Sequence, residues 1–331
     1  MPQILRTTLI DNEAHAADGV FNFDLPVNPI SAILLTVKAL NAQGQGQQYR
    51  SSDQLYKVVT NARVAYRGAT IIEGSLQDLM MMMHVLTGWQ PGPLIDSDND
   101  NHPRALTVPL CFGRRPYDPL ECFPATRRGD LILALTLDTS VTGFDTFVLQ
   151  AETIELLEAQ PARFTKITTI SKVHNAAGDH DVELPISNDI LGIGLWSPTI
   201  PTLTNYNAAI GALRLQVDNV ETMISSTNWE TLHGELRRLA PHGFSSRNHT
   251  HYKDPTLPPV DNYTETYKDD GENATKFAYL DFDPLKDGQY ALRTAGAARV
   301  NLRITDDIGS GDAIRVLPVE LVPLATGAAA A

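Results

Sequence analysis

Cysteine is almost missing from this 331-residue chain, which contains only Cys111 and Cys122. Two cysteines are too few for a disulfide-rich secreted scaffold, and their separation of 11 residues (122 − 111) does not match the ligand spacing of a zinc finger. We therefore expect both thiols to be buried and to act as small apolar side chains rather than as a site.

Long apolar runs are missing as well. No stretch of the chain reaches the roughly 18 consecutive apolar residues that a membrane-spanning helix needs. The first residues, "MPQILRTTLIDNEAH", lack the apolar core of a signal peptide. The sequence thus predicts neither a membrane-spanning segment nor conventional secretion.

Basic residues are scarce relative to acidic ones. The chain has 26 Lys and Arg against 39 Asp and Glu, which gives a formal charge of −13 and an isoelectric point near 5.1. Affinity for phosphate backbones rests on clustered Lys and Arg, so direct binding of nucleic acid is not expected. Patterns such as GxSxG, HExxH, the P-loop and the dinucleotide fingerprint are also absent, which favours a structural role over a catalytic one.

The chain is instead rich in short segments of Val, Ile, Leu and Thr, which are typical of β-strands. In the first half, five such segments precede a predicted helix at 75–88, which has a Ser at its start and a Gly at its end. Three more follow it, and in one of them every second residue from Leu131 to Leu137 is Leu, which indicates one buried face. The eight predicted strands are 4–10, 20–27, 30–40, 55–66, 69–74, 105–112, 130–138 and 145–156.

The second half repeats this order. Five predicted strands precede a second helix at 228–240, which begins at Asn228, and three strands follow. The alternation of Val300, Leu302 and Ile304 again indicates one buried face. The predicted strands are 164–171, 180–186, 190–196, 209–220, 221–226, 275–282, 298–305 and 312–324.

Short sequence matches fall in the same order in both halves. "FDLPV" at 23–27 corresponds to "VELPI" at 182–186, and "YDPLECF" at 117–123 corresponds to "FDPLKDG" at 282–288. The matches indicate a tandem duplication. Eight strands per copy predict an all-β protein of two antiparallel jelly-roll sandwiches, each with one short helix after the fifth strand. We place the first domain at 1–160 and the second at 161–331, with a long polar insert at 241–276.

This architecture resembles the double jelly-roll major capsid proteins of tailless icosahedral viruses, the lineage of membrane-containing bacteriophages and adenoviruses. The resemblance rests on the two tandem copies and the repeated "DLP/ELP" and "DPL" segments, and it covers the whole chain. It implies a viral coat protein without enzymatic activity, whose homotrimers form pseudo-hexagonal tiles. It also implies packing against neighbouring capsomers and penton or minor proteins in a virion shell, after synthesis in the host cytoplasm.

An internal membrane is a further partner that the resemblance suggests. Many relatives begin with a helix facing that membrane, whereas this chain begins with a strand-like segment at Ile4. The sequence therefore leaves contact with a membrane open.

The alternative hypothesis is a bicupin-like metalloenzyme or a carbohydrate-binding double sandwich. His249 and His251 are separated by one residue, so on a strand they would share a face and could bind one metal ion. A cupin motif requires a Glu three or four residues later, where Pro255 and Thr256 stand, and the composition of the segment indicates a loop. For carbohydrate binding the candidates are the aromatic rings of Tyr252, Tyr263 and Tyr267.

A second weak metal candidate lies in "DSDNDNH". Asp96, Asp98 and Asp100 alternate as at the start of a calcium loop, but the Gly and Glu of that motif are missing. A solvated loop is the favoured interpretation. We expect no catalytic residues and no cofactor, with structural calcium as the one alternative.

Two further segments carry expectations about exposure. The insert at 241–276 is polar and lacks apolar periodicity, so we expect a surface loop that projects from the end of its sandwich, with 89–104 as its shorter counterpart. "LMMMMHVL" at 79–86 could be a soft binding surface, but four adjacent Met cover every side of a helix. We therefore expect that helix to be buried.

Overall fold

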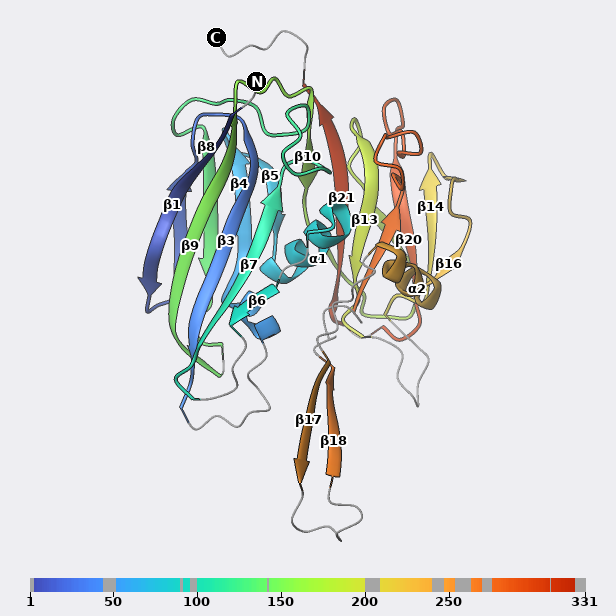
Figure 1. Ribbon diagram of the computed structural model, residues 1–331. Helices are drawn as coiled ribbons and strands as arrows, with labels where there is room; N and C mark the ends of the chain where they lie inside the picture. Colours follow the sequence, from blue (N-terminus) through green and yellow to red (C-terminus); the bar gives the residue numbers. More distant parts are fainter. Residues whose placement is uncertain are drawn as a thin grey trace.

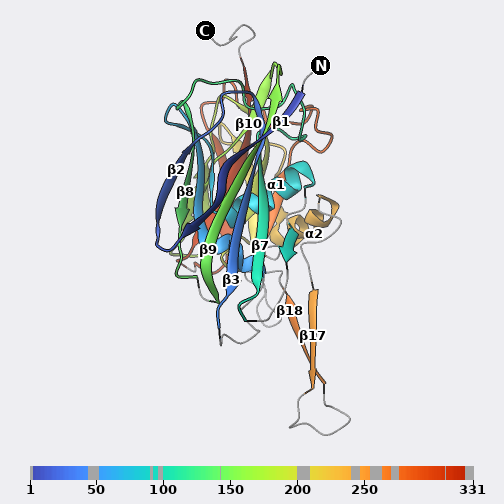
Figure 2. The same ribbon diagram turned by 60° about the vertical axis from the view of Figure 1, so that its left-hand side comes forward.

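Two β-sandwiches stand side by side, and a thin two-stranded ribbon projects from one end of the molecule (Figures 1 and 2). The computed structural model describes residues 3–43, 52–89, 92–95, 100–141, 143–199, 209–239, 247–253, 263–269, 276–309 and 311–324. The first strand begins and the last strand ends at the end of the molecule opposite to the ribbon (Figure 1).

The first sandwich is built from the first half of the chain. One sheet has the strand order β1-β9-β3-β7-β6, and the facing strands have the order β2-β8-β4-β5. A 3-10 helix, η2, precedes β4, and helix α1 follows β5. The bounds are β1 Gln3–His15, β2 Gly19–Asp24, β3 Ile30–Asn41, η2 Ser52–Val58, β4 Val59–Tyr66, β5 Ala69–Gly74, α1 Leu76–Thr87, β6 Gly92–Ile95, β7 Pro103–Cys111, β8 Leu131–Leu137 and β9 Phe144–Leu157.

The second sandwich repeats this pairing. β21 lies between β13 and the pair β10 and β11, β13 also pairs with β19, and the facing sheet has the order β12-β20-β14-β15, with β16 also paired to β14. The bounds are β10 Arg163–Ile167, β11 Ile170–Val173, β12 Gly178–Glu183, β13 Asp189–Trp196, β14 Ala212–Val217, β15 Val220–Glu221, β16 Thr227–Asn228, α2 Trp229–Leu239, β17 Arg247–Lys253, β18 Tyr263–Asp269, β19 Phe277–Asp281, β20 Val300–Asp306 and β21 Ala313–Pro323.

The two sandwiches have the same wiring strand for strand. In the first, β9 lies between β1 and β3, and in the second, β21 lies between β10 and β13. The repeated segments also make the same backbone bonds: Ile30 pairs with Phe123 across the first copy, and Ile190 pairs with Leu292 across the second. The predicted all-β double jelly roll is confirmed. The predicted boundary at residue 160 lies between the end of β9 and the start of β10 and stays a prediction.

Burial in both sandwiches follows the alternation of the sequence. Leu131, Leu133, Leu135 and Leu137 of β8 are all buried. Their counterparts in β20, Val300, Leu302 and Ile304, are fully buried as well. Both cysteines are buried free thiols, as predicted, and burial raises the pKa of each thiol to about 12, Cys122 being affected by Asp118 as well.

The capping residues of α1 do what their types predict. Ser75 accepts a hydrogen bond from the backbone N–H of Asp78 at 3.1 Å. Gly88 has a φ of 72° and donates its N–H to the carbonyl of His84 at 2.8 Å, which closes the helix. The helix predicted after the second set of strands is also present, but Asn228 lies in β16 opposite Ala212 and precedes the first helical residue.

Four predicted segments differ from the structure. Residues 55–58, predicted as strand, lie in η2, because a short buried apolar run fits a helical turn and a strand equally well. Of the strand predicted at 221–226, only Glu221 lies in a strand, β15, although Thr222 and Ile224 also make backbone hydrogen bonds to Leu215 of β14. The segments predicted as loops contain strands: β6 within 89–104, and β17 and β18 within the insert. The composition of the insert showed that it is polar. It did not show that two of its segments pair through backbone hydrogen bonds, because polar residues can form strands when a partner strand is available.

Helix α1 lies between the two sandwiches (Figure 1). Its four methionines, Met80 to Met83, are buried, which confirms the expected burial of this helix. The core of the first copy continues through it to side chains of the second copy. The contact is close at Gly194 of β13, where a Cβ atom would overlap the sulfur of Met82. Only a residue without a side chain lets the helix approach the strand this closely.

We predict that Gly194→Ala destabilises the protein through this contact. The added methyl should overpack the site and lower the free energy of unfolding by about 1–3 kcal/mol. Met82→Ala alone should cost about 2–5 kcal/mol through the cavity it leaves. The double variant should lose less unfolding free energy than the two single variants lose together, because the cavity left by Met82→Ala has room for the methyl group that Gly194→Ala adds. Chemical denaturation of the four proteins measures this coupling, and strict additivity would show that the two residues do not share a packing site.

Candidate functional site

The junction between the two sandwiches holds a charged pair whose aspartate is buried and whose arginine is partly exposed. Asp78, in the first turn of α1, is fully buried and accepts two hydrogen bonds from Arg315 of β21, at 2.6 and 2.8 Å. The guanidinium of Arg315 also lies 3.6 Å from the ring centre of Trp196 in β13. This bidentate and stacked geometry fixes the helix of the first copy to the sheet of the second.

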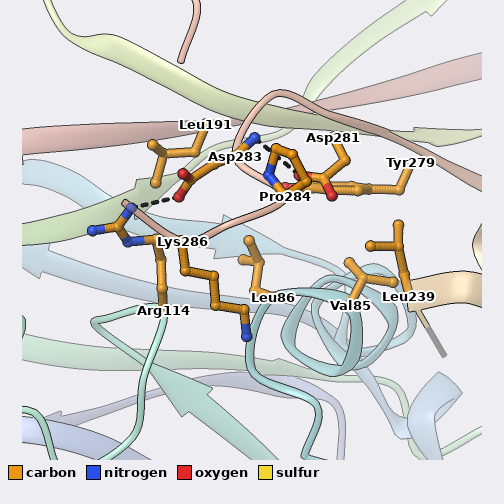
Figure 3. Close-up of a pocket in the computed structure, with 10 residues that line it drawn as sticks. All are labelled: Val85, Leu86, Arg114, Leu191, Leu239, Tyr279, Asp281, Asp283, Pro284 and Lys286. Atoms are coloured by element: carbon orange, nitrogen blue, oxygen red, sulfur yellow. Dashed lines mark hydrogen bonds and ion pairs between the residues drawn. The ribbon is translucent and has the colours of Figure 1, made fainter. Parts of the chain in front are cut away.

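A second buried charge cluster joins the loops that follow β7 and β19. Arg114 donates to Glu121, with an Nε to Oε2 distance of 3.0 Å, and forms a further ion pair with Asp283 of the second copy (Figure 3). The side chains of all three are at most 4% exposed. Arg163, at the start of β10, adds a bond to Glu121 at 2.7 Å. One guanidinium therefore neutralises carboxylates from both halves of the chain.

The pKa values in this cluster are displaced toward the charged forms. Burial alone raises the pKa of Glu121, but the hydrogen bonds and charge of Arg114, with the charge of Arg163, outweigh it and hold that pKa below its ordinary value. Burial alone lowers the pKa of Arg114, and its bonds to Glu121 and Asp283 raise it well above the ordinary value. Both shifts favour the ionised forms of Arg114 and Glu121.

The repeated Asp-Pro-Leu segments supply one member of this cluster. In both copies the segment forms a turn, in which the carbonyl of Asp118 accepts from Glu121 N–H and that of Asp283 accepts from Lys286 N–H. The side chain of Asp118 caps its own turn by accepting from Leu120 N–H at 2.9 Å. The side chain of Asp283 also accepts a local hydrogen bond, from Gly288 N–H to Oδ1 at 2.7 Å, and its other oxygen pairs with Arg114. The aspartate thus serves local capping in both copies, and in the second copy it also joins the junction.

A small pocket of about 50 Å³ opens beside this cluster (Figure 3). Side chains from both helices and both copies line it, including Leu86 of α1, Leu239 of α2 and Tyr279 of β19. Tyr279 is buried, and burial together with Asp281 and Asp283 raises the pKa of its hydroxyl well above the ordinary value. Lys286 also lines the pocket, and its pKa is lowered by burial and by Arg115 and Arg114, against the raising effect of Asp281 and Asp283. The pocket has room for little more than water, and its polar groups belong to the junction.

Equivalent exposed apolar side chains occur in both copies, at the end of the sandwiches where the first strand starts. Val27 and Ile186 follow β2 and β12 and are 43% and 42% exposed. Leu120 and Leu285 occupy the two Asp-Pro-Leu turns and are 57% and 60% exposed. Backbone bonds join Ala162 to Leu120 and Leu324 to Ala162, which places these loops beside the ends of β9 and β21. Exposed apolar side chains thus recur at equivalent positions of the two copies.

The same loops are slightly basic in an acidic chain. Residues 112–130 carry four basic and three acidic residues, and residues 282–299 carry three basic and two acidic, so each loop has a formal charge of +1 against −13 for the whole chain. We name these two loops, together with Val27 and Ile186, the loop end of the molecule. The sequence analysis used the segments that contain these residues as evidence of duplication and not as a surface, because exposure of an apolar side chain depends on the fold. Their equivalent positions in the two repeats were the one available signal.

The residues that the sequence suggested as metal ligands fall outside the sandwiches. His249 and His251 lie on β17, in the ribbon that pairs with neither sandwich. Tyr252 lies on the same strand, and Tyr263 and Tyr267 lie on β18. Asp100 lies in an exposed turn, whereas Asp96 and Asp98 lie outside the described residues. Among the side chains described outside the ribbon, no group of three or more His, Cys, Asp and Glu is arranged to hold a metal ion.

The described helices contain no segment long and apolar enough to cross a membrane. This agrees with the absence of long apolar runs in the sequence.

We predict that the buried cluster makes the protein sensitive to acid. Glu121→Gln should lower the free energy of unfolding at pH 7 by about 3–5 kcal/mol, because Arg114 loses a buried counter-charge. Since the pKa of folded Glu121 is lowered, its contribution is complete above the ordinary value of 4.5 and is lost as the pH falls through the folded value. The difference between wild type and variant should therefore shrink below pH 4.5. Denaturation at several pH values tests this, with Glu158→Gln on the surface as the matched control; a loss no larger than that of the control would contradict the role of the cluster.

Comparison with known proteins gives structural matches alone. Neither a protein-family model nor a curated relative matches the sequence. The atomic structure of Sulfolobus Turreted Icosahedral Virus contains a chain that is 15% identical, with a TM-score of 0.66 over 97% of this chain and 91% of that one. The major capsid protein of bacteriophage PM2 is 12% identical, with a TM-score of 0.59 over 98% of this chain and 99% of that one. The PBCV-1 virus capsid gives 9% identity and a TM-score of 0.59 over 97% and 94%. At these identities the comparisons establish the fold, and the chain is a double jelly roll over essentially its whole length.

Proposed function

We propose that this chain is a viral major capsid protein whose homotrimers form pseudo-hexagonal tiles of an icosahedral shell. The observation that carries the proposal is the strand-for-strand repetition of two sandwiches held rigidly side by side. Three such chains around a threefold axis would present six similar sandwiches, a shape that fills a surface without gaps. The matches to capsid proteins along their full length, rather than to one sandwich of a larger enzyme, support the same role.

The junction would give the tile its rigidity. The pairs Asp78–Arg315 and Arg114–Asp283 each join one copy to the other, and in each the carboxylate is buried. A capsomer contacts neighbouring capsomers on several sides, so a change in the angle between its two sandwiches would disrupt those contacts. The proposal thus explains why ionic groups, which contribute geometric specificity more than stability, are buried at this seam.

The loop end would supply contacts to other components of the virion. Equivalent apolar side chains in both copies, such as Leu120 and Leu285, would give the six sandwiches of a trimer a repeated contact. The partners that we propose are neighbouring capsomers and penton or minor capsid proteins, with an internal membrane as the alternative surface. The acidic charge of the chain argues against direct contact with the genome.

We also propose a non-enzymatic role. The pocket at the junction is small, and its ionised groups are engaged in binding one another. We propose that the protein is synthesised in the host cytoplasm and functions in the virion, as a coat subunit does.

The oligomeric state tests the proposal directly. Size-exclusion chromatography with light scattering should give three times the chain mass of 36.2 kDa at micromolar concentration. Negative-stain images should show particles with a pseudo-hexagonal outline. A stable monomer at these concentrations would overturn the proposal.

The loop end can be tested with charged substitutions. Leu120→Asp combined with Leu285→Asp should leave the trimer and its melting temperature nearly unchanged, because both side chains are exposed, while shell assembly is lost. Val20→Asp, at an exposed position of β2, is the matched control and should assemble normally. Flotation with anionic vesicles distinguishes a contact with capsid proteins from a contact with a membrane. If the wild type binds the vesicles and the double variant does not, the loop end contacts a membrane. Normal shell assembly by the double variant would contradict the role of the loop end.

A further inference from the structure

A buried histidine occupies the same place in each copy, at the turn that leads into β2 or β12. His15 ends β1 and His174 follows β11. Their separation of 159 (174 − 15) equals the offset between the two Leu-Pro segments, which begin at Leu25 and Leu184 (184 − 25). The two histidines are only 6% and 1% exposed. Each sandwich therefore has one buried imidazole at this turn.

Each buried histidine packs against a ring from the next strand, again at matched positions. His15 lies against Phe21 of β2, with the ring centres 4.2 Å apart and the planes at 63°. His174 lies against His180 of β12, with the ring centres 3.9 Å apart and the planes nearly parallel, at 15°. Phe21 and His180 are also separated by 159 residues (180 − 21). The second copy therefore has a second imidazole where the first copy has a ring that cannot carry a charge.

The turn that carries His174 is tied to the segment that joins β20 to β21. The carbonyl of His174 accepts a hydrogen bond from Gly311 N–H at 3.0 Å. Gly309 packs so closely on the same turn that a Cβ atom would lie 2.6 Å from the backbone of Ala176. β21 starts at the end of the molecule that carries the ribbon, so both connections lie at that end (Figure 1). A movement of the histidine pair would therefore loosen two connections of the second sandwich together.

One carboxylate faces the histidine pair. Oδ2 of Asp306, at the end of β20, lies 3.4 Å from Nδ1 of His174. Among the described residues, neither this oxygen nor either ring nitrogen of His174 has a hydrogen-bond partner. The other oxygen of Asp306 accepts from the N–H groups of Ile308 and Gly309, each at 2.8 Å. The site thus offers one partly engaged negative charge to two imidazoles.

The other charged groups near the pair do not compensate a second positive charge. Lys172 on β11 is a further cation that acts on the site. Asp179 and Asp181 flank the second histidine on β12, so they lie on the opposite face of that strand, where they bond to residues of β20. After β20, Asp307 packs beside the start of β14, and Asp312 is exposed.

The pKa of His174 reflects these surroundings. Burial and the charge of His180 lower this pKa, with a smaller contribution from Lys172, and together they outweigh the raising effect of Asp306. Because the pKa lies below its ordinary value of 6.5, the unfolded chain binds this proton more readily than the folded chain. Stability at this site is therefore complete above pH 6.5 and is lost as the pH falls toward the folded value.

We propose that His174 and His180 form an acid-sensitive switch, which holds their turn against the segment joining β20 to β21 at neutral pH and releases it in acid. While the imidazoles are neutral, the rings stack and the bond from Gly311 holds the turn. When both carry a proton, two cations 3.9 Å apart share one carboxylate, and separating the rings lets water solvate both charges. In the first copy Phe21 stays uncharged. This inference goes beyond the proposed coat function and is independent of it.

Hydrogen exchange of the full-length protein, measured by mass spectrometry and corrected for the intrinsic effect of pH, tests the switch. Between pH 7.5 and pH 5.0, peptides that cover 172–180 and 311–316 should lose protection on the order of tenfold or more, because like charges in contact repel strongly even near a protein surface. β13, in the same sandwich, should keep its protection. The lower pH remains above 4.5, the ordinary pKa of Glu121, so the buried junction cluster should stay intact.

Two variants isolate the second imidazole. His180→Phe gives the second copy the ring pair of the first, and it should keep the protection at pH 7.5 and lose most of the pH dependence. His180→Gln, which retains a hydrogen-bond donor for the carbonyl of Ala176 that His180 bonds at 2.8 Å, should behave in the same way. The turn between β1 and β2 is the internal control, because its ring pair contains only one imidazole.

Unchanged protection of the wild type between the two pH values would overturn the proposal, and so would a pH dependence that both variants retain. A loss of protection spread over all strands of the second sandwich would also contradict it, because that result indicates global unfolding and not a local release. The oligomeric state at pH 7.5 tests the coat function alone. The two proposals can therefore fail separately.

Discussion

The fixed packing of one sandwich against the other is the constraint on which the rest of this structure depends. Met82 of α1 fits against Gly194 of β13 because that strand carries no side chain there. The Asp78–Arg315 pair then sets the helix in one orientation, since a bidentate guanidinium tolerates little rotation. Apolar burial supplies most of the stabilising free energy at such a seam, and the buried charges select one arrangement among several apolar ones.

The duplication explains how the seam arose without a new fold. Both copies retain the turn formed by Asp-Pro-Leu, and in the second copy the aspartate extends to Arg114 of the first. The two helices also differ: all residues of α1 except Gln77 and Thr87 are buried, whereas several described residues of α2 are exposed. The two sandwiches share one topology but contribute different residues to the junction between them.

The two ends of the molecule differ in their chemistry. The loop end carries apolar side chains at equivalent places of both copies and a slight positive charge, whereas the opposite end carries a polar ribbon that breaks the repeat. In a symmetric assembly each contact occurs once per copy, so residues that are equivalent in both sandwiches can make twice as many similar contacts. The ribbon is present once per chain and has no counterpart among the described residues of the first copy.

The amino-acid sequence by itself determined the β-class, the duplication, the buried faces of strands such as β8 and β20, and helix α1 with its caps, because all of these depend on local periodicity and on capping chemistry. It left η2 and the ribbon strands undetected, since short apolar runs and polar strands take their conformation from their neighbours. The tertiary structure alone decided that Arg114 meets Asp283, 169 residues away, and that Glu265 lies opposite His251. Such contacts follow from the packing and register of segments distant in the chain, which no local pattern records.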